Sequence, residues 1–156
     1  MKIPRTSIIY KRGDATTHKE PSLIAHVCNI NKEWDTDFLK ALSAIDMTPE
    51  TDYHKWAANS VTASGIPFEL GNVHLTRFND IHIVASMLAK STATSLDYEA
   101  LRTCLEKLTL IAQRAKLPVV APRFGSEIGG ADWQVIEEMI EDTLIAHDIH
   151  VTVYTP

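Results

Sequence analysis

Two stretches of the sequence combine the residue types that an anionic ligand would need. Each follows an apolar run typical of a buried strand and precedes a segment with the apolar spacing of a helix. At such a strand-to-helix crossing, backbone N–H groups and the positive end of the helix dipole point toward the same space. Residues 28–38 and residues 122–133 are therefore the candidate anion-binding segments.

The second of these crossings has the more favourable composition. It reads PRFGSEIGGADW and contains Gly125, Gly129 and Gly130. Glycine permits positive φ angles and exposes the backbone N–H groups that bind phosphate oxygens. This pattern predicts an anion site, and the alternative is an ordinary flexible turn.

The first crossing reads CNINKEWDTDF and has no glycine. Its charged residues are Lys32, Glu33, Asp35 and Asp37. A carboxylate about 4 Å from a phosphate costs about 1 kcal/mol in water, and several-fold more in a partly dry cleft. A structural alternative is that Asp35 or Thr36 caps the following helix and that Asp37 complements the helix dipole.

The seven histidines and two cysteines give no second candidate site. The histidines show no paired spacing such as H-E-x-x-H, so we expect structural histidines, with His26 hydrogen-bonded in the interior, and no metal site. Cys28 lies in an apolar run and Cys104 on an apolar helix face, which favours buried, reduced thiols over a disulfide.

The elements that must position the two crossings alternate along the chain. Strands are expected over residues 7–12, 22–29, 72–78, 81–89, 118–124 and 149–155. Helices are expected over residues 35–45, from Thr48 as N-cap with Pro49 as first helical residue, over 97–115 and over 131–146. This order predicts an α/β fold with three α/β/α layers and a central mixed, mostly parallel sheet, as one domain over residues 1–156.

Length and charge exclude several classes of protein. The chain has 156 residues and a formal charge of −5, without a run of Lys or Arg, so direct nucleic-acid binding is not expected. It has no apolar stretch near the roughly 20 residues of a membrane span and no signal-peptide pattern at its start. These features favour a cytoplasmic protein without a membrane partner.

Several motifs together resemble the macrodomain family. They are GDAT at residues 13–16, IAHVCN at 24–29, the aromatic pair Trp34 and Phe38, PRFG followed by GG and Trp at 122–133, and IHVTVYT at 149–155. The likeness extends from about residue 7 to residue 155. It is greatest for the small bacterial and phage members and for the branch that removes ADP-ribose from carboxylate side chains.

The resemblance implies an ADP-ribose cleft at the carboxyl ends of the strands, with no cofactor. Asp14 would accept a hydrogen bond from the adenine amino group, and Ala15 would offer its backbone N–H. Asn29 would position the distal ribose, and Trp34 matches an aromatic position of the family's first loop. The second loop would wrap the diphosphate and distal ribose with its backbone: Gly125, Ser126, Glu127, Ile128, Gly129 and Gly130.

The first crossing departs from the family pattern. Close relatives have approximately Gly-Gly-Trp-Gly-Ala-Gly-Phe where this chain has residues 32–38. Both aromatic residues match, but every glycine is replaced. The added Cβ atoms and carboxylates predict a loop that disfavours ADP-ribose in the usual pose.

The catalytic pattern of the de-ADP-ribosylating branch is also incomplete. That branch has a lysine after the fourth strand and an aspartate in the second loop. Lys90 lies within one residue of the lysine position, whereas the aspartate position falls on Gly129, with Glu127 and Asp132 nearby. Lys90 with Glu127 is the candidate catalytic pair, and the alternative is that Lys90 is a solvated surface residue.

Two functions remain open on the sequence. One is a macrodomain that binds ADP-ribose, or an ADP-ribosylated protein or nucleic acid, and hydrolyses ADP-ribosyl esters. The other is a degenerate macrodomain without this hydrolysis, which binds another nucleotide or a protein partner.

Overall fold

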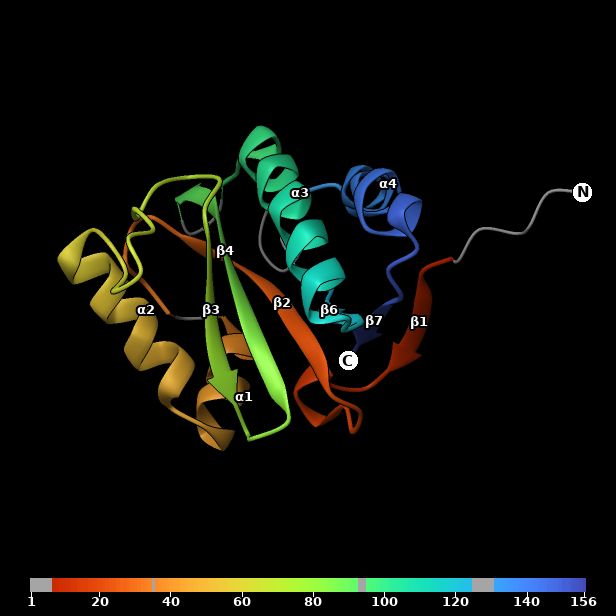
Figure 1. Ribbon diagram of the computed structural model, residues 1–156, viewed down its shortest axis with the longest axis horizontal. Coiled ribbons are helices and arrows are strands. Elements are labelled where there is room, and N and C mark those ends of the chain that lie inside the picture. The colour runs from red at the N-terminus through yellow and green to blue at the C-terminus, as the bar shows by residue number, and fades with distance from the viewer. Residues whose placement is uncertain (1–6, 35, 93–94, 125–130) are drawn as a thin grey trace, which may run out of the picture.

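The computed structural model describes residues 7–34, 36–92, 95–124 and 131–156 (Figure 1). The predicted order of strands and helices is confirmed, with one short additional strand. The elements are β1 (Ile9–Arg12), η1 (Ala15–Thr17), β2 (Ser22–Asn29), α1 (Asp37–Ile45), α2 (Thr48–Asn59), β3 (Val73–Phe78), β4 (His82–Thr92), β5 (Ser95–Leu96), α3 (Tyr98–Ala115), β6 (Val119–Pro122), α4 (Trp133–Thr143), η2 (Ile145–His147) and β7 (Val151–Thr155).

The strands form one mixed sheet in the order β1-β7-β6-β2-β4-β3, with β5 paired to β4. The first five strands of this order are mutually parallel, and β3 and β5 run antiparallel to β4. The prediction of a mixed, mostly parallel sheet is therefore confirmed. Because five strands are parallel, their carboxyl ends lie along one edge of the sheet.

Helices cover both faces of this sheet (Figure 1). In the central strand β2 every residue is buried, as its nearly continuous apolar sequence predicts. Leu23 and Val27 pack in the cluster that contains residues of α3 and α4. Ile24 packs with Leu42 of α1, and Cys28 packs with residues of α2. Successive side chains of β2 thus face opposite sides of the sheet and pack in different cores. The α/β/α architecture is confirmed.

A polar side chain caps the start of each α-helix except α2. Thr36 caps α1 by accepting a hydrogen bond from the Leu39 N–H at 3.2 Å, and Asp37 lies in the first turn. The prediction that Thr48 caps α2 is wrong, because Met47 occupies the N-cap position and Thr48 is the first helical residue. Asp46 instead accepts a hydrogen bond from the Thr48 N–H at 2.9 Å, so the acceptor lies one residue before the cap.

Two serine–histidine pairs link β2 to β4 inside the structure. Ser22 donates to His82 Nδ1 at 3.0 Å, and Ser86 donates to His26 Nε2 at 2.8 Å. The prediction of an interior, hydrogen-bonded His26 is confirmed. Burial lowers the pKa of His26 to about 4, so the ring is neutral at pH 7. Its Nε2 can therefore accept the hydrogen bond from the Ser86 hydroxyl.

Within the described residues, no helix is both long enough and apolar enough to cross a membrane.

Both cysteines are free and buried, as the sequence indicates. Cys28 packs in the cluster beside α2, whereas Cys104 packs in the cluster on the other face of the sheet. Burial raises the pKa of the Cys28 thiol above its ordinary range and that of Cys104 to about 12.

These thiols should not react in the folded protein, because the reacting species is the thiolate. We expect Ellman's reagent to label neither cysteine rapidly under native conditions and to label both after denaturation. A native thiol that reacts at the rate of a free cysteine would contradict the buried placement.

Candidate functional site

The fold predicts a ligand crevice where β2 separates from β6. The two strands pair only at Leu23 with Val119 and at Ile24 with Val120. Beyond that point β2 continues along β4, and β6 continues along β7. The chain leaves β2 toward α1 on one face of the sheet and leaves β6 toward α4 on the other. Neighbouring parallel strands whose connections diverge in this way form the usual ligand crevice of an open α/β sheet.

The two crossings singled out in the sequence therefore start from neighbouring strands. The first starts after Asn29 at the end of β2, and the second follows Phe124 after β6. Residues 125–130 lie outside the described residues, so the predicted contacts of Gly125, Ser126, Glu127, Ile128, Gly129 and Gly130 remain predictions.

Asn29 holds the first crossing in a closed turn. The side chain is almost fully buried, and its Oδ1 accepts a hydrogen bond from the Glu33 N–H at 3.2 Å. Its Nδ2 donates to the Glu33 carbonyl oxygen at 3.3 Å. The amide thus pairs with one peptide unit of the loop through both of its polar atoms. Each polar atom has further hydrogen-bonding capacity that a ligand could use.

Two aromatic side chains, Tyr53 and Trp34, connect this turn to the core. Tyr53 of α2 is fully buried and donates from its hydroxyl to the Asn29 carbonyl oxygen at 2.5 Å. The Trp34 ring lies 5.3 Å from the Tyr53 ring and 5.4 Å from the His26 ring, measured between centroids. Trp34 Nε1 donates to the Ser43 hydroxyl at 2.8 Å. Trp34 therefore fastens the loop to α1 and the core, which gives this predicted ligand residue a structural role.

Lys32 shows that the loop keeps a glycine-like backbone without glycine. Its φ angle is 67°, in the left-handed region that side chains with a Cβ atom disfavour. In the family pattern this place belongs to a glycine. The two hydrogen bonds between Asn29 and Glu33 stabilise the loop and offset the free-energy cost of the left-handed conformation at Lys32.

Asp14 lies just beyond the carboxyl end of β1. Its Oδ1 accepts a hydrogen bond from the Thr16 N–H at 2.9 Å, and the residue caps the short helix η1. This contact leaves Oδ2 for a further donor. Ala15 is buried, and its carbonyl oxygen accepts from the His18 N–H at 3.2 Å. A half-buried carboxylate fixed through one oxygen is suited to accept from an amino group.

Lys90 lies inside β4, directly beside Asn29 in the strand pairing. The side chain is only 4% exposed, so the alternative of a solvated surface lysine is wrong. The charge also acts on its neighbours: burial lowers the pKa of His26 first, and Lys90 lowers it further. A buried cation at the carboxyl ends of β2 and β4 is positioned to contact an anion in the crevice.

Aromatic and cationic side chains flank the second crossing. Phe124, before the crossing, packs edge-to-face on Trp133, after it, with ring centroids 5.9 Å apart. The Arg123 guanidinium lies 5.2 Å from the centre of the Trp133 ring. Trp133 Nε1 donates to the Tyr10 hydroxyl at 3.0 Å, which ties the start of α4 to β1. Trp133 thus contacts both the segment before the second crossing and the edge strand β1.

Two residues of the site were missed by the sequence analysis. Arg123 was quoted within the PRFG motif, but its position against Trp133 was not inferred. The Tyr53 ring lies in the core, and its hydroxyl contact with Asn29 has no signal in the sequence. Helix periodicity predicts which face of α2 is buried and does not predict which strand residue the hydroxyl meets.

In the parts of the chain that the structure describes, no three His, Cys, Asp or Glu side chains are grouped to hold a metal ion. Asp14, Asn29 and Lys90 lie at the carboxyl ends of β1, β2 and β4, the edge of the sheet where the fold predicts the ligand crevice.

The structure is similar to several solved proteins. A protein of Bacteroides thetaiotaomicron matches with a TM-score of 0.86 and 31% identity, over 95% of this chain and 99% of its own. A macrodomain protein of Streptomyces coelicolor matches with a TM-score of 0.84 and 32% identity, over 96% of this chain and 99% of its own. DarTG of Thermosipho africanus, in complex with ADP-ribose, matches with a TM-score of 0.74 and 12% identity, over 92% of this chain and 40% of its own.

No protein-family model matches the sequence, and no curated protein matches it. The Streptomyces protein is sufficient for assignment, because identity above 30% extends over nearly the whole of both chains. The chain belongs to the macrodomain family, and the resemblance seen in its motifs is confirmed.

The backbone of Lys32 gives a test of the first crossing. Substitution Lys32→Gly should stabilise the protein by roughly 0.5–1 kcal/mol, because the relief of left-handed strain exceeds the added entropy of the unfolded chain. The measurement is the free energy of unfolding from urea denaturation. The control Lys40→Gly, at an exposed position within helix α1, should destabilise the protein by about 1 kcal/mol. A destabilising effect of Lys32→Gly would show that the loop has a different backbone.

Proposed function

We propose that this macrodomain binds ADP-ribose, or an ADP-ribosyl group on a protein or nucleic acid, in the crevice between β2 and β6. The observation that carries the proposal is the divergence of these two strands, because it opens the carboxyl edge of the sheet between two strand-to-helix crossings. Family membership supports the same ligand class. A further neighbour of the same fold is itself in complex with ADP-ribose.

The described residues suit the two ends of such a ligand. Asp14 has one carboxylate oxygen engaged by the Thr16 N–H, and the other would accept from the adenine amino group. Asn29 and Lys90 lie side by side on β2 and β4, where the distal ribose and its substituent would lie.

The first crossing would contribute little to binding of the diphosphate. The Glu33 N–H is already used by Asn29, and the Leu39 N–H by Thr36. Glu33 and Asp37 add negative charge to the same segment. We therefore assign the diphosphate to the second crossing, and this assignment includes residues 125–130.

Hydrolysis of an ADP-ribosyl ester is the finer part of the proposal. Lys90 would act on the distal ribose carbon that carries the ester, and Glu127 would orient the lysine amine. The buried position of Lys90 beside Asn29 supports this role, because a surface lysine would not be held at the crevice.

The alternative function is a macrodomain without this activity that binds another nucleotide or a protein partner. The observation in its favour is the first crossing, where Asn29 and Thr36 already bind the backbone N–H groups that a phosphate would use.

Calorimetric titration with ADP-ribose separates the two functions. The proposal predicts a dissociation constant on the order of micromolar, corresponding to about −8 kcal/mol. Substitution Asp14→Asn should weaken binding roughly tenfold, because an amide NH₂ replaces one acceptor oxygen while the other oxygen still caps η1. An unchanged melting temperature would show that the fold is intact. A flat titration of the unaltered protein would favour the alternative.

Substitution Lys90→Met tests the catalytic assignment. The methionine keeps the apolar stem in its buried site and removes the amine. Hydrolysis of an ADP-ribosylated glutamate peptide should fall at least about a hundredfold, while ADP-ribose affinity changes by a factor of about three or less. Glu127→Gln should reduce the rate in the same direction. Unchanged turnover in both variants would refute the pair.

A further inference from the structure

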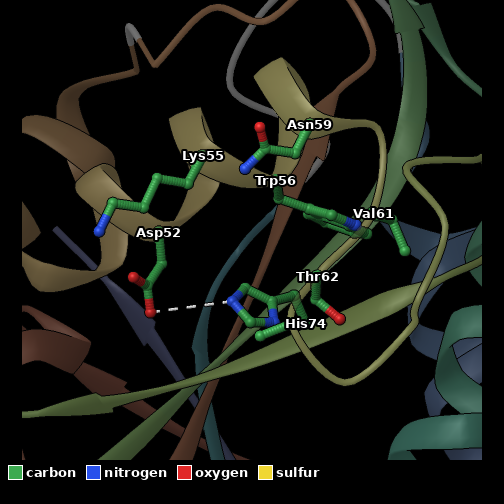
Figure 2. A pocket seen from close by; sticks show the side chains of 8 residues that line it. Asp52, Lys55, Trp56, Asn59, Val61, Thr62 and His74 are labelled. Atoms are coloured by element: carbon green, nitrogen blue, oxygen red, sulfur yellow. Dashed lines mark ion pairs between the residues drawn. The ribbon is translucent and has the colours of Figure 1, made fainter.

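A second cavity lies between α2 and the edge strand β3, with a volume of about 540 Å³ (Figure 2). Its lining comes from helix α2, from the segment that follows α2 and from β3. The α2 residues Asp52, Trp56 and Asn59 are spaced as neighbours along one helix face. The β3 residue is His74. None of these side chains has a role in the crevice between β2 and β6.

Asp52 is held in place by two groups of β3. Its Oδ2 accepts a hydrogen bond from the buried Thr76 hydroxyl at 3.3 Å and lies 3.8 Å from His74 Nε2. Both contacts use the same oxygen, which leaves Oδ1 for a further donor. A carboxylate fixed in this way has lost most of its side-chain freedom before a ligand arrives, which favours binding.

His74 adds a second acceptor without adding positive charge. Its Nε2 points at the Asp52 carboxylate, so this nitrogen carries the proton and Nδ1 keeps a lone pair (Figure 2). Burial lowers the pKa of His74, although Asp52 opposes this shift, and the ring is neutral at neutral pH. Among the described residues that line the cavity, the remaining ionisable side chains are those of Asp52 and Lys55.

The rest of the lining combines the Trp56 and His74 rings with the small side chains of Val61, Thr62 and Ala63. The Trp56 ring lies 5.5 Å from the His74 ring between centroids, and both rings line the cavity. Trp56 Nε1 donates away from the cavity, to the Ile66 carbonyl oxygen at 2.9 Å. Within the described chain Asn59 makes no side-chain hydrogen bond, so its carbonyl oxygen is a further acceptor. Figure 2 shows the Lys55 side chain extending away from Trp56 and His74.

We propose that this cavity binds a guanidinium group, as carried by an arginine side chain of a partner polypeptide. A guanidinium is planar, has five N–H donors and packs against aromatic rings. Asp52 Oδ1, His74 Nδ1 and the Asn59 carbonyl oxygen are the matching acceptors, and Trp56 and His74 are the matching rings. The cavity is larger than one guanidinium and leaves room for flanking chain, and the net charge of −5 favours a basic partner.

The first test uses nuclear magnetic resonance titration of the intact protein. The probes are a blocked pentapeptide with one arginine among glycines, the same peptide with lysine, and agmatine as a small guanidinium. The arginine peptide should shift the Trp56 indole and His74 ring signals with a dissociation constant on the order of millimolar. The lysine peptide should bind roughly threefold more weakly, because an ammonium cannot form the planar fork.

Two substitutions are expected to change the affinity for the arginine peptide in opposite directions. Asp52→Asn should weaken binding of the arginine peptide at least about fivefold, because the paired charge is lost. Lys55→Gln should strengthen it about twofold, because a repelling cation at the cavity is removed. Lys55 is exposed, so this variant does not depend on the fold tolerating a change at Asp52. Asp80→Asn, in the exposed turn between β3 and β4, is the matched control and should leave binding unchanged.

Failure of this proposal can be told apart from failure of the proposed function, because the peptide titrations contain no ADP-ribose. Stronger binding of the arginine peptide than of agmatine would support a polypeptide partner. Equal binding of both would support the guanidinium site and assign it to small molecules instead. The absence of shifts at about 10 mM peptide, or equal affinity in the unaltered protein and the Asp52→Asn and Lys55→Gln variants, would overturn the proposal.

Discussion

β2 and β6 share two paired positions, Leu23 with Val119 and Ile24 with Val120, and then separate. Each strand needs a hydrogen-bonded neighbour beyond that point, and each has one, since β2 pairs with β4 and β6 pairs with β7. The sheet therefore opens at its carboxyl edge between β2 and β6, while each of these strands stays paired on its other side. Both candidate crossings start at this opening, and the buried Lys90 and Asn29 lie on its β2 and β4 side.

The first crossing adopts a left-handed backbone position although it contains no glycine. The left-handed backbone at Lys32 is unfavourable for a residue with a Cβ atom. The buried Asn29 amide compensates by pairing with the Glu33 peptide, and the Tyr53 hydroxyl holds the Asn29 carbonyl. The loop is thus kept in shape by side chains that use the same backbone groups a ligand would use. The shape of the loop is therefore set by these side-chain contacts.

Helix α2 links the crevice to the second cavity. A continuous series of ring contacts runs from Trp34 in the first crossing through Tyr53, Phe68 and Trp56 to His74 at the cavity. Tyr53 and Phe68 pack between the two ends of this series, whereas Trp56 and His74 line the cavity. One face of α2 thus supports the first crossing through Tyr53, and a neighbouring part of the same helix lines the cavity through Asp52 and Asn59.

Local patterns in the sequence were enough to predict the architecture, the bounds of β2 and the family, and to narrow the cap of α1 to Asp35 or Thr36, because periodicity, capping chemistry and motif spacing are properties of neighbouring residues. They misplaced the cap at Met47 and left the exposure of Lys90 open, because these depend on packing around the residue. Tertiary structure alone decided that Asn29 lies beside Lys90, that Tyr53 reaches the end of β2 and that Asp52 meets His74. Each of these contacts joins residues that are more than 20 positions apart, and only strand register and helix packing bring such residues together.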